Sequence, residues 1–135
     1  MTEKKTTGLH WLVNRLIISY LPVAARNESF FVNNVPPDLR FEADDERVAT
    51  VLGGMLSSMA SQSKDSCILI SARLYHDGIL VTVRDNQLYN TMAITHSLQQ
   101  MQGLTKQIGG FLGISNERKD ETVITFSFPS LALSA

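Results

Sequence analysis

Apolar residues recur at helical spacing in three stretches of the chain. Within each stretch they fall three or four residues apart, which is the period of one face of an α-helix. We therefore expect three amphipathic helices. The positions that define them are Leu9, Leu12, Val13, Leu16, Ile17 and Tyr20; Val48, Val51, Leu52, Met55, Leu56 and Met59; and Ile94, Leu98, Met101, Leu104 and Ile108.

Polar residues, prolines and glycines predict where these helices begin and end. Thr7 is a candidate cap for the first helix, and Pro22 limits how far that helix can run. Asp44 supplies a cap for the second helix, and Asp45 adds favourable charge at its start. The pair at residues 109–110 is Gly-Gly, which ends the third helix.

Between the helices, apolar and polar residues alternate in short runs typical of strands. The runs are 30–35, 39–43, 67–75, 79–84, 111–115 and 122–128. The turn His76-Asp77-Gly78 joins two of them, so these two are expected to be antiparallel neighbours. The order of elements predicts an α+β two-layer sandwich, with helices on one face of a mixed, mostly antiparallel sheet. We place the amphipathic helix and a linker in residues 1–29, and the sheet-bearing domain in 30–135.

Composition narrows the classes of function. The chain has 135 residues, of which 44% are apolar and 19% charged, as in one soluble domain. Its net charge of -1 argues against nucleic acid or an anionic membrane as partners. No apolar run is long enough to span a bilayer and no signal peptide is visible, so we expect a cytoplasmic protein. Cys67 lies in an apolar run and is expected to be a buried core thiol.

The order of elements resembles the ATP-binding domain of sensor histidine kinases, which belongs to the GHKL or Bergerat-fold ATPases. Three features carry the resemblance: the helix from Asp45, the hairpin that ends on Asp85-Asn86, and Ile-Gly-Gly before the last two strands. It covers roughly residues 30 to 129, and it implies the α+β sandwich described above.

The resemblance also implies a nucleotide pocket with altered residues. Asp85 corresponds to the aspartate that accepts a hydrogen bond from the adenine amino group. Ser58 stands where the family has the asparagine that helps to hold magnesium, and Gly54 lies one turn earlier, where the family often has asparagine. Together with Asn86, these residues are the candidate vestigial nucleotide pocket.

Both glycine motifs of the family are lost. The first reads Asp-x-Gly-x-Gly in the family, but here Gln87 and Tyr89 replace its two glycines. In place of the second, this chain has Thr-His-Ser at residues 95–97. Glycines there let the backbone approach the nucleotide, and amides at the helix start would cradle phosphates. We therefore expect a non-catalytic, pseudo-ATPase regulatory or interaction module of bacterial-type signalling, without a cofactor.

Two alternatives stay open at this point. One is a divergent ATP-binding domain of a sensor histidine kinase, which would use ATP and Mg. The other is a phosphotransfer protein that uses His10. The space beside Asp85 separates the first alternative from a pseudo-site: an open cleft favours a ligand, whereas filling by side chains argues against one. The side chains that could fill it are Met55, Met59, Tyr89 and Met92.

The expected partners are proteins. A response regulator fits the resemblance, and the first helix is a candidate for homodimer formation if its own sheet leaves its apolar stripe uncovered. Neither a nucleic acid nor a membrane is expected as a partner. The three histidines lack ligand spacing, so no metal site is expected. The pair Gly53-Gly54 in the second helix costs about 1 kcal/mol per glycine relative to alanine, which indicates either a close approach to its backbone or overriding tertiary packing.

Overall fold

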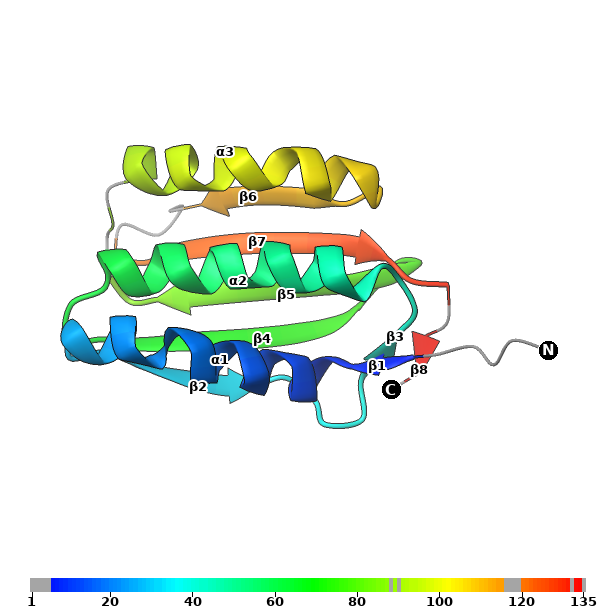
Figure 1. The fold of residues 1–135 in the computed structure, drawn as a ribbon, viewed down its shortest axis with the longest axis horizontal. Helices are drawn as coiled ribbons and strands as arrows, with labels where there is room; N and C mark the ends of the chain where they lie inside the picture. The colour runs from blue at the N-terminus through cyan, green and yellow to red at the C-terminus, as the bar shows by residue number, and fades with distance from the viewer. Residues whose placement is uncertain (1–5, 88, 90, 116–119, 132, 135) are drawn as a thin grey trace.

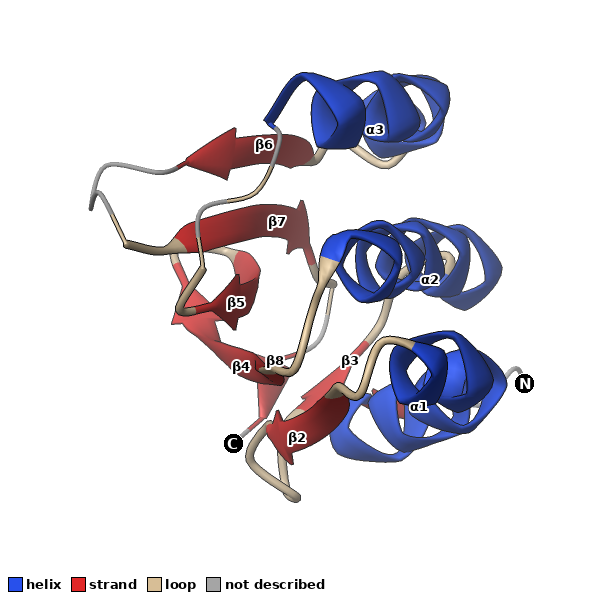
Figure 2. Cartoon of the chain, turned by 90° about the vertical axis from the view of Figure 1, so that its left-hand side faces the viewer, coloured by secondary structure: helices blue, strands red, loops and turns tan. Residues whose placement is uncertain are grey.

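The computed structural model of the chain describes residues 6–87, 89, 91–115, 120–131 and 133–134. In this part, three helices lie side by side in one layer and cover one face of a five-stranded sheet (Figures 1 and 2). The predicted α+β two-layer sandwich is confirmed. The elements are β1 (Thr7–Gly8), α1 (Leu9–Arg26), β2 (Phe30–Asn34), β3 (Arg40–Phe41), α2 (Asp45–Gln62), β4 (Cys67–Tyr75), β5 (Gly78–Asp85), α3 (Thr91–Gln107), β6 (Phe111–Ser115), β7 (Thr122–Pro129) and β8 (Leu133–Ser134).

The large sheet has the strand order β2-β4-β5-β7-β6. Strand β2 runs parallel to β4, and the other neighbouring pairs are antiparallel. The predicted hairpin is therefore correct, with Tyr75 opposite Gly78 at its turn. At the far end of the hairpin, Asp85 lies opposite Thr122 of β7. This register places Asp85 at the end of the central strand of the sheet, shortly before α3 begins along the chain.

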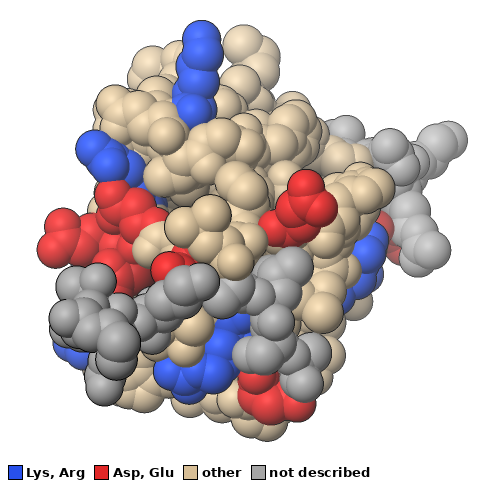
Figure 3. All heavy atoms as spheres, turned by 90° about the vertical axis from the view of Figure 1, so that its right-hand side faces the viewer, with Lys and Arg blue, Asp and Glu red and all other residues tan. Residues whose placement is uncertain are grey.

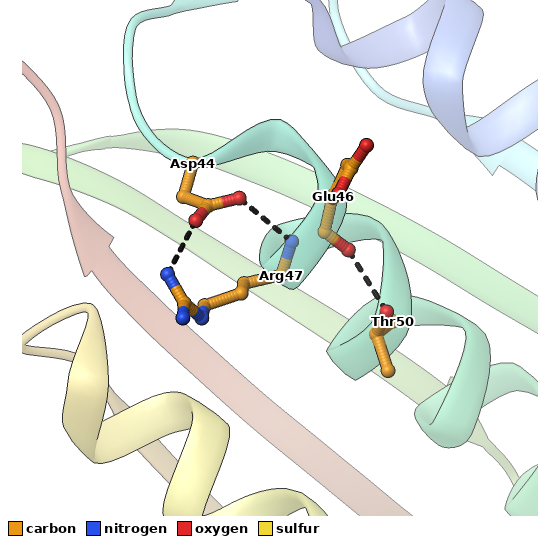
Figure 4. Close-up of polar contacts among 4 residues, drawn as sticks. All are labelled: Asp44, Glu46, Arg47 and Thr50. Atoms are coloured by element: carbon orange, nitrogen blue, oxygen red, sulfur yellow. Dashed lines mark hydrogen bonds and ion pairs between the residues drawn. The ribbon is translucent and has the colours of Figure 1, made fainter.

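Helix α2 begins as its sequence predicts (Figure 4). The Asp44 carboxylate accepts a hydrogen bond from the Arg47 amide at 3.1 Å, and its other oxygen contacts the Arg47 guanidinium at 2.6 Å. The Thr50 hydroxyl donates to the Glu46 carbonyl at 2.9 Å. The hydrogen bond from the Arg47 backbone amide, above all, lowers the pKa of Asp44. Asp44 is thus a helix cap, and the acidic run that it opens needs no role in acid–base chemistry.

Helix α1 differs from its prediction at both ends. Gly8, not Thr7, is the residue that precedes it, and no side chain caps it. The helix continues through Pro22 to Arg26. Proline has no N–H to bond the carbonyl four residues earlier, which here belongs to Ile18. Pro22 and Ile18 are both exposed, so water can reach that carbonyl and the helix tolerates the loss.

The core draws on all three helices and on the sheet. Leu9 of α1, Met55 of α2, Ile94 of α3 and Phe126 of β7 are fully buried in one cluster. The helix expected in residues 1–29 therefore shares one core with the segment after residue 30. The core also covers the stripe of α1 that was considered for self-association: Leu9, Leu12 and Val13 are buried, and Leu16, Ile17 and Tyr20 pack against the cluster.

Cys67 is exposed, and its prediction as a core thiol is wrong. It is the first residue of β4, and its neighbours Ile68 and Ile70 take the buried positions. Side chains alternate between the two faces of a strand, so Cys67 falls on the face opposite the helices. The apolar run around it did not reveal which face it would take.

A second, smaller sheet was missed because its strands are only two residues long and carry no periodicity. It joins β1, β3 and β8, so a strand from the beginning and a strand from the end of the described chain lie on either side of β3 (Figure 1). On the face that includes this end of the molecule, basic and acidic side chains are interspersed (Figure 3). No helix in the described residues is long and apolar enough to cross a membrane.

Candidate functional site

Asp85 and Tyr89 form a buried hydrogen-bonded pair at the end of β5. Asp85 is 3% exposed and Tyr89 is 7% exposed. The Tyr89 hydroxyl donates a short hydrogen bond to the Asp85 carboxylate. Burial, followed by the hydrogen bond to Asp85 and its charge, raises the pKa of Tyr89 far above its ordinary value. Tyr89 therefore stays protonated at physiological pH and acts as the donor in this pair.

Further hydrogen bonds hold Gln87 and Tyr89 in place. The Tyr89 amide donates to the Thr122 hydroxyl at 3.0 Å, and that hydroxyl donates to the Gln87 carbonyl at 2.8 Å. The Gln87 side-chain amide donates to the Lys64 carbonyl at 2.6 Å. Gln87 and Tyr89, the two residues that replace the glycines of the family motif, are thus bonded to β7 and to the loop that follows α2.

Ser58 also has a partner within the chain. It is 5% exposed on α2, and its hydroxyl is hydrogen-bonded at 2.7 Å to the hydroxyl of Ser97 on α3. Ser97 belongs to the Thr-His-Ser sequence that replaces the second glycine motif. The two altered positions therefore bind each other and hold the two helices together.

The Gly53-Gly54 pair lets two neighbouring helices approach α2 closely. A Cβ added at Gly53 would lie 2.9 Å from the hydroxyl oxygen of Tyr20 on α1. A Cβ added at Gly54 would lie 3.0 Å from the Cγ atom of Met101 on α3. The glycines in this helix are thus explained by packing within the protein, which is one of the two explanations that the sequence left open.

A groove of about 530 Å³ crosses the outer side of the helix layer. All of its lining residues are uncharged, so its walls offer no cation to a phosphate group. Asp85 is not among them. The predicted pocket is therefore divided, with Gly54 on the groove and Asp85 buried elsewhere. The lining residues are Leu16, Tyr20, Ala49, Thr50, Gly54, Ser57, Ser97, Gln100 and Met101.

The remaining candidates do not join this site. Asn86 is exposed beside Asp85. Of the four side chains considered for filling the space beside Asp85, Tyr89 bonds to it, while Met92 is 81% exposed. His10 lies on α1, His76 in the hairpin turn and His96 on α3. Among the described residues, no group of three or more His, Cys, Asp or Glu side chains could hold a metal ion.

Tyr89 is the residue that the sequence underestimated. Its position was recognised as a lost glycine and as one of four side chains that could fill the space, but its bond to Asp85 was not foreseen. The spacing of four residues between a carboxylate and a tyrosine was the available signal. That spacing brings two side chains together in a helix, but here it begins at the last residue of a strand and lies outside any helix, where spacing predicts little.

Comparison with known proteins gives a match in structure only. No protein-family model matches the chain, and no curated protein matches it in sequence. The histidine kinase AdeS of Acinetobacter baumannii aligns with a TM-score of 0.79 at 11% identity, over 97% of this chain and 70% of that one. The nucleotide-free catalytic domain of the histidine kinase ThkA aligns with a TM-score of 0.73 at 17% identity, over 96% and 97% of the two chains.

Two larger structures contain the same fold. Full-length ShkA in complex with AMPPNP aligns with a TM-score of 0.76 at 15% identity, over 98% of this chain and 33% of that one. ThkA in complex with the response regulator protein TrrA aligns with a TM-score of 0.72 at 18% identity, over 93% of this chain and 41% of that one. From its layers, its strand order and these matches, the chain has the fold of the ATP-binding catalytic domain of histidine kinases.

Proposed function

We propose that this chain is a cytoplasmic regulatory or interaction module of bacterial-type signalling that uses the histidine kinase ATPase fold without binding ATP productively. The observation that carries the proposal is the bond between Tyr89 and Asp85. In the family that the sequence resembles, this aspartate accepts its hydrogen bond from adenine. Here a side chain of the protein supplies the donor, so adenine would have to displace a buried and anchored tyrosine.

The expected magnesium and phosphate positions support the same proposal. A serine hydroxyl is a weaker magnesium ligand than an asparagine amide oxygen, and the Ser58 hydroxyl is already bonded to Ser97. Gly54 has no side chain to offer, and Met101 occupies the space next to it. These residues do not fit a nucleotide bound through magnesium, so we assign the protein no catalytic step and no cofactor.

Titration calorimetry with ATP and magnesium tests the proposal directly. We expect no heat of binding and no thermal shift at millimolar nucleotide, while full-length ShkA, which has been crystallised with AMPPNP, serves as the positive control. Saturable, magnesium-dependent binding that is lost in Asp85→Asn would overturn the proposal. That result would instead establish the alternative, a divergent ATP-binding domain that uses Asp85 and Ser58.

A response regulator is the partner that we propose for this module. The support is that ThkA, which shares the fold, has been crystallised with the response regulator TrrA. The test is titration of the labelled chain with purified receiver domains, with and without a phosphate mimic on the receiver aspartate. Saturable binding to at least one receiver domain is expected. Failure of a complete set of receivers from the same genome to bind would remove this partner class.

A further inference from the structure

Helix α1 has a second apolar stripe that its own domain leaves uncovered. The stripe lies on the opposite side of the helix from Tyr20, which packs toward α2. Its large members are exposed, with Trp11 at 56%, Ile18 at 72% and Leu21 at 47%. A side chain with this exposure contributes little to the fold of a single copy. We call this surface the outer stripe; it consists of Trp11, Asn14, Ile18, Leu21 and Ala25.

The spacing of the outer stripe is that of a helix-pairing seam. Its members are separated by three, four, three and four residues, which is the a and d pattern of a coiled coil. At a rise of about 1.5 Å per residue, the stripe extends for roughly 21 Å along the helix. Such a surface fits a second helix laid along α1.

The sheet is also open on the same side of the molecule. Strand β2 is an edge strand, and it lies beside α1 at the same end of the two layers (Figure 2). The Asn33 side chain joins the two layers, since it donates to the His10 carbonyl at 3.0 Å and to the Asn14 side chain at 2.8 Å. Phe30 is 55% exposed and Val32 is 38% exposed. Strand β2 contains neither a charged residue nor a proline, the usual protections of an exposed edge.

The opposite side of the sandwich shows that this fold does not require an apolar stripe on its outer helix. There α3 and β6 are the outermost elements. Apart from Met92, the exposed positions of α3 are polar or glycine. They include Thr95, His96, Gln99, Gln102, Lys106 and Gln107. The edge strands are alike, since β6 also lacks charged residues and proline and its Phe111 is 60% exposed. The difference lies in the helices: the outer stripe of apolar residues is specific to α1.

We propose that the edge formed by α1 and β2 binds a second copy of this chain in a twofold dimer. A twofold axis perpendicular to the sheet would place α1 antiparallel to its copy and, at the same time, β2 antiparallel to its copy. Both layers would then continue across the interface. A standard interface buries about 1,600 Å², and in this arrangement both the helical stripe and the edge strand contribute to the buried area.

The outer stripe complements itself in this orientation. If the axis passes at Ile18, the large Trp11 faces the small Ala25 of the second copy. The charges do not oppose this pairing: Arg26 and Glu28 are exposed at one end of α1, and Asp38 and Arg40 at the other. Each end carries one charge of either sign, so antiparallel pairing brings no group of like charges together.

Light scattering coupled to size exclusion tests the dimer. At about 100 µM, far above a micromolar Kd, we expect twice the 15.0 kDa mass of one chain. Ile18→Glu places two carboxylates at the axis and should weaken association by roughly 30-fold or more. Met92→Glu on α3 and Phe111→Glu on β6 are matched controls on the opposite edge and should remain dimeric. A monomeric parent chain, or a dimeric and folded Ile18→Glu variant, would overturn the proposal.

Cysteine cross-linking tests the orientation. In a Cys67→Ser background, Ile18→Cys should cross-link to its own copy under mild oxidation, because it lies at the axis. A mixture of the Trp11→Cys and Ala25→Cys proteins should give the mixed dimer, whereas Trp11→Cys alone should give none. Cross-linking of Trp11→Cys to itself would indicate parallel helices and would contradict the interface proposed here.

Discussion

The two ends of the expected nucleotide pocket are closed in different ways. At the Asp85 end, one buried tyrosine bonds to a carboxylate, and hydrogen bonds that join Tyr89, Thr122 and Gln87 hold these residues in place. At the Ser58 end, two helices approach each other through a pair of neutral hydroxyls and a glycine against a methionine. The first closure depends on a charged hydrogen bond in a buried place, and the second on packing. The Asp85 end should therefore be the more costly to open.

The largest effect is expected from Tyr89→Ala. Removing a buried aromatic side chain costs about 3–5 kcal/mol of unfolding free energy, and here it also leaves Asp85 without its donor. Urea unfolding measures the change. The same variant should gain weak binding of adenosine, without dependence on magnesium, because only the Asp85 end has been opened. A variant as stable as the parent would contradict the role assigned to Tyr89.

A smaller effect is expected from Tyr89→Phe, which keeps the ring and removes only the donor. The cost of leaving a buried acceptor unpaired is about 1–3 kcal/mol. Unfolding at neutral pH gives this value, and Tyr75→Phe, at an exposed tyrosine, is the control. If both substitutions change stability equally, the bond to Asp85 contributes nothing specific.

The dependence of stability on pH provides an independent measure of the same bond. The pKa of Tyr89 is raised in the folded state, whereas an unfolded tyrosine titrates at about 10. Above that pH the folded state holds a proton that the unfolded state has lost. The stability contributed by Tyr89 is therefore complete below about pH 10 and falls above it. The parent should lose more stability than Tyr89→Phe between pH 9 and 11, and equal losses would contradict the raised pKa.

At the Ser58 end, Gly54→Asn restores the residue that the family often has. An added side chain would meet Met101, so we expect a loss of about 1–3 kcal/mol from overpacking. Combining the change with Met101→Ala should recover part of the loss. Gly103→Asn on α3 is the control, since no atom lies within 4 Å of a Cβ added there, and its effect should stay within about 0.5 kcal/mol.

The smallest effect is expected from the serine pair. Ser97→Ala leaves the Ser58 hydroxyl without its partner and should cost about 0.5–1.5 kcal/mol. The double change Ser58→Ala with Ser97→Ala should cost less than the sum of the two single changes. Each single change leaves one hydroxyl without its partner, whereas the double change removes both hydroxyls. Additive losses in this cycle would show that the hydroxyls act independently.

The pattern of the sequence predicted the scaffold well. The stripe of α2 and the hairpin of β4 and β5 were located within a residue or two, because periodic burial repeats over many positions. The cap at Asp44 was also predicted, since its partner lies three residues away. Interactions this close along the chain depend on local geometry alone. The two-residue strands of the small sheet were not predicted, because they depend on partners that are distant along the chain. The continuation of α1 past Pro22 was not predicted, because it depends on access of water to the Ile18 carbonyl.

For the site, the sequence predicted which positions differ from the family's nucleotide motifs. It did not predict which contacts within the protein these positions make. The loss of both glycine motifs was visible in Gln87, Tyr89 and residues 95–97. That Tyr89 bonds to Asp85, that Ser97 bonds to Ser58 and that Met101 packs on Gly54 are contacts between elements. Each depends on how closely α3 and the segment before it approach α2 and the end of β5.

The order of elements, the sheet pairing at the hairpin and the ends of α2 thus follow from local patterns, which repeat along the chain and need few distant partners. The exposure of Cys67 and the choice of which stripe of α1 is buried did not follow from them. A helix or strand with two apolar faces can turn either face to the core, and only packing against the other layer selects one. The tertiary structure therefore decided that Tyr89 occupies the Asp85 end and that Trp11, Ile18 and Leu21 remain outside.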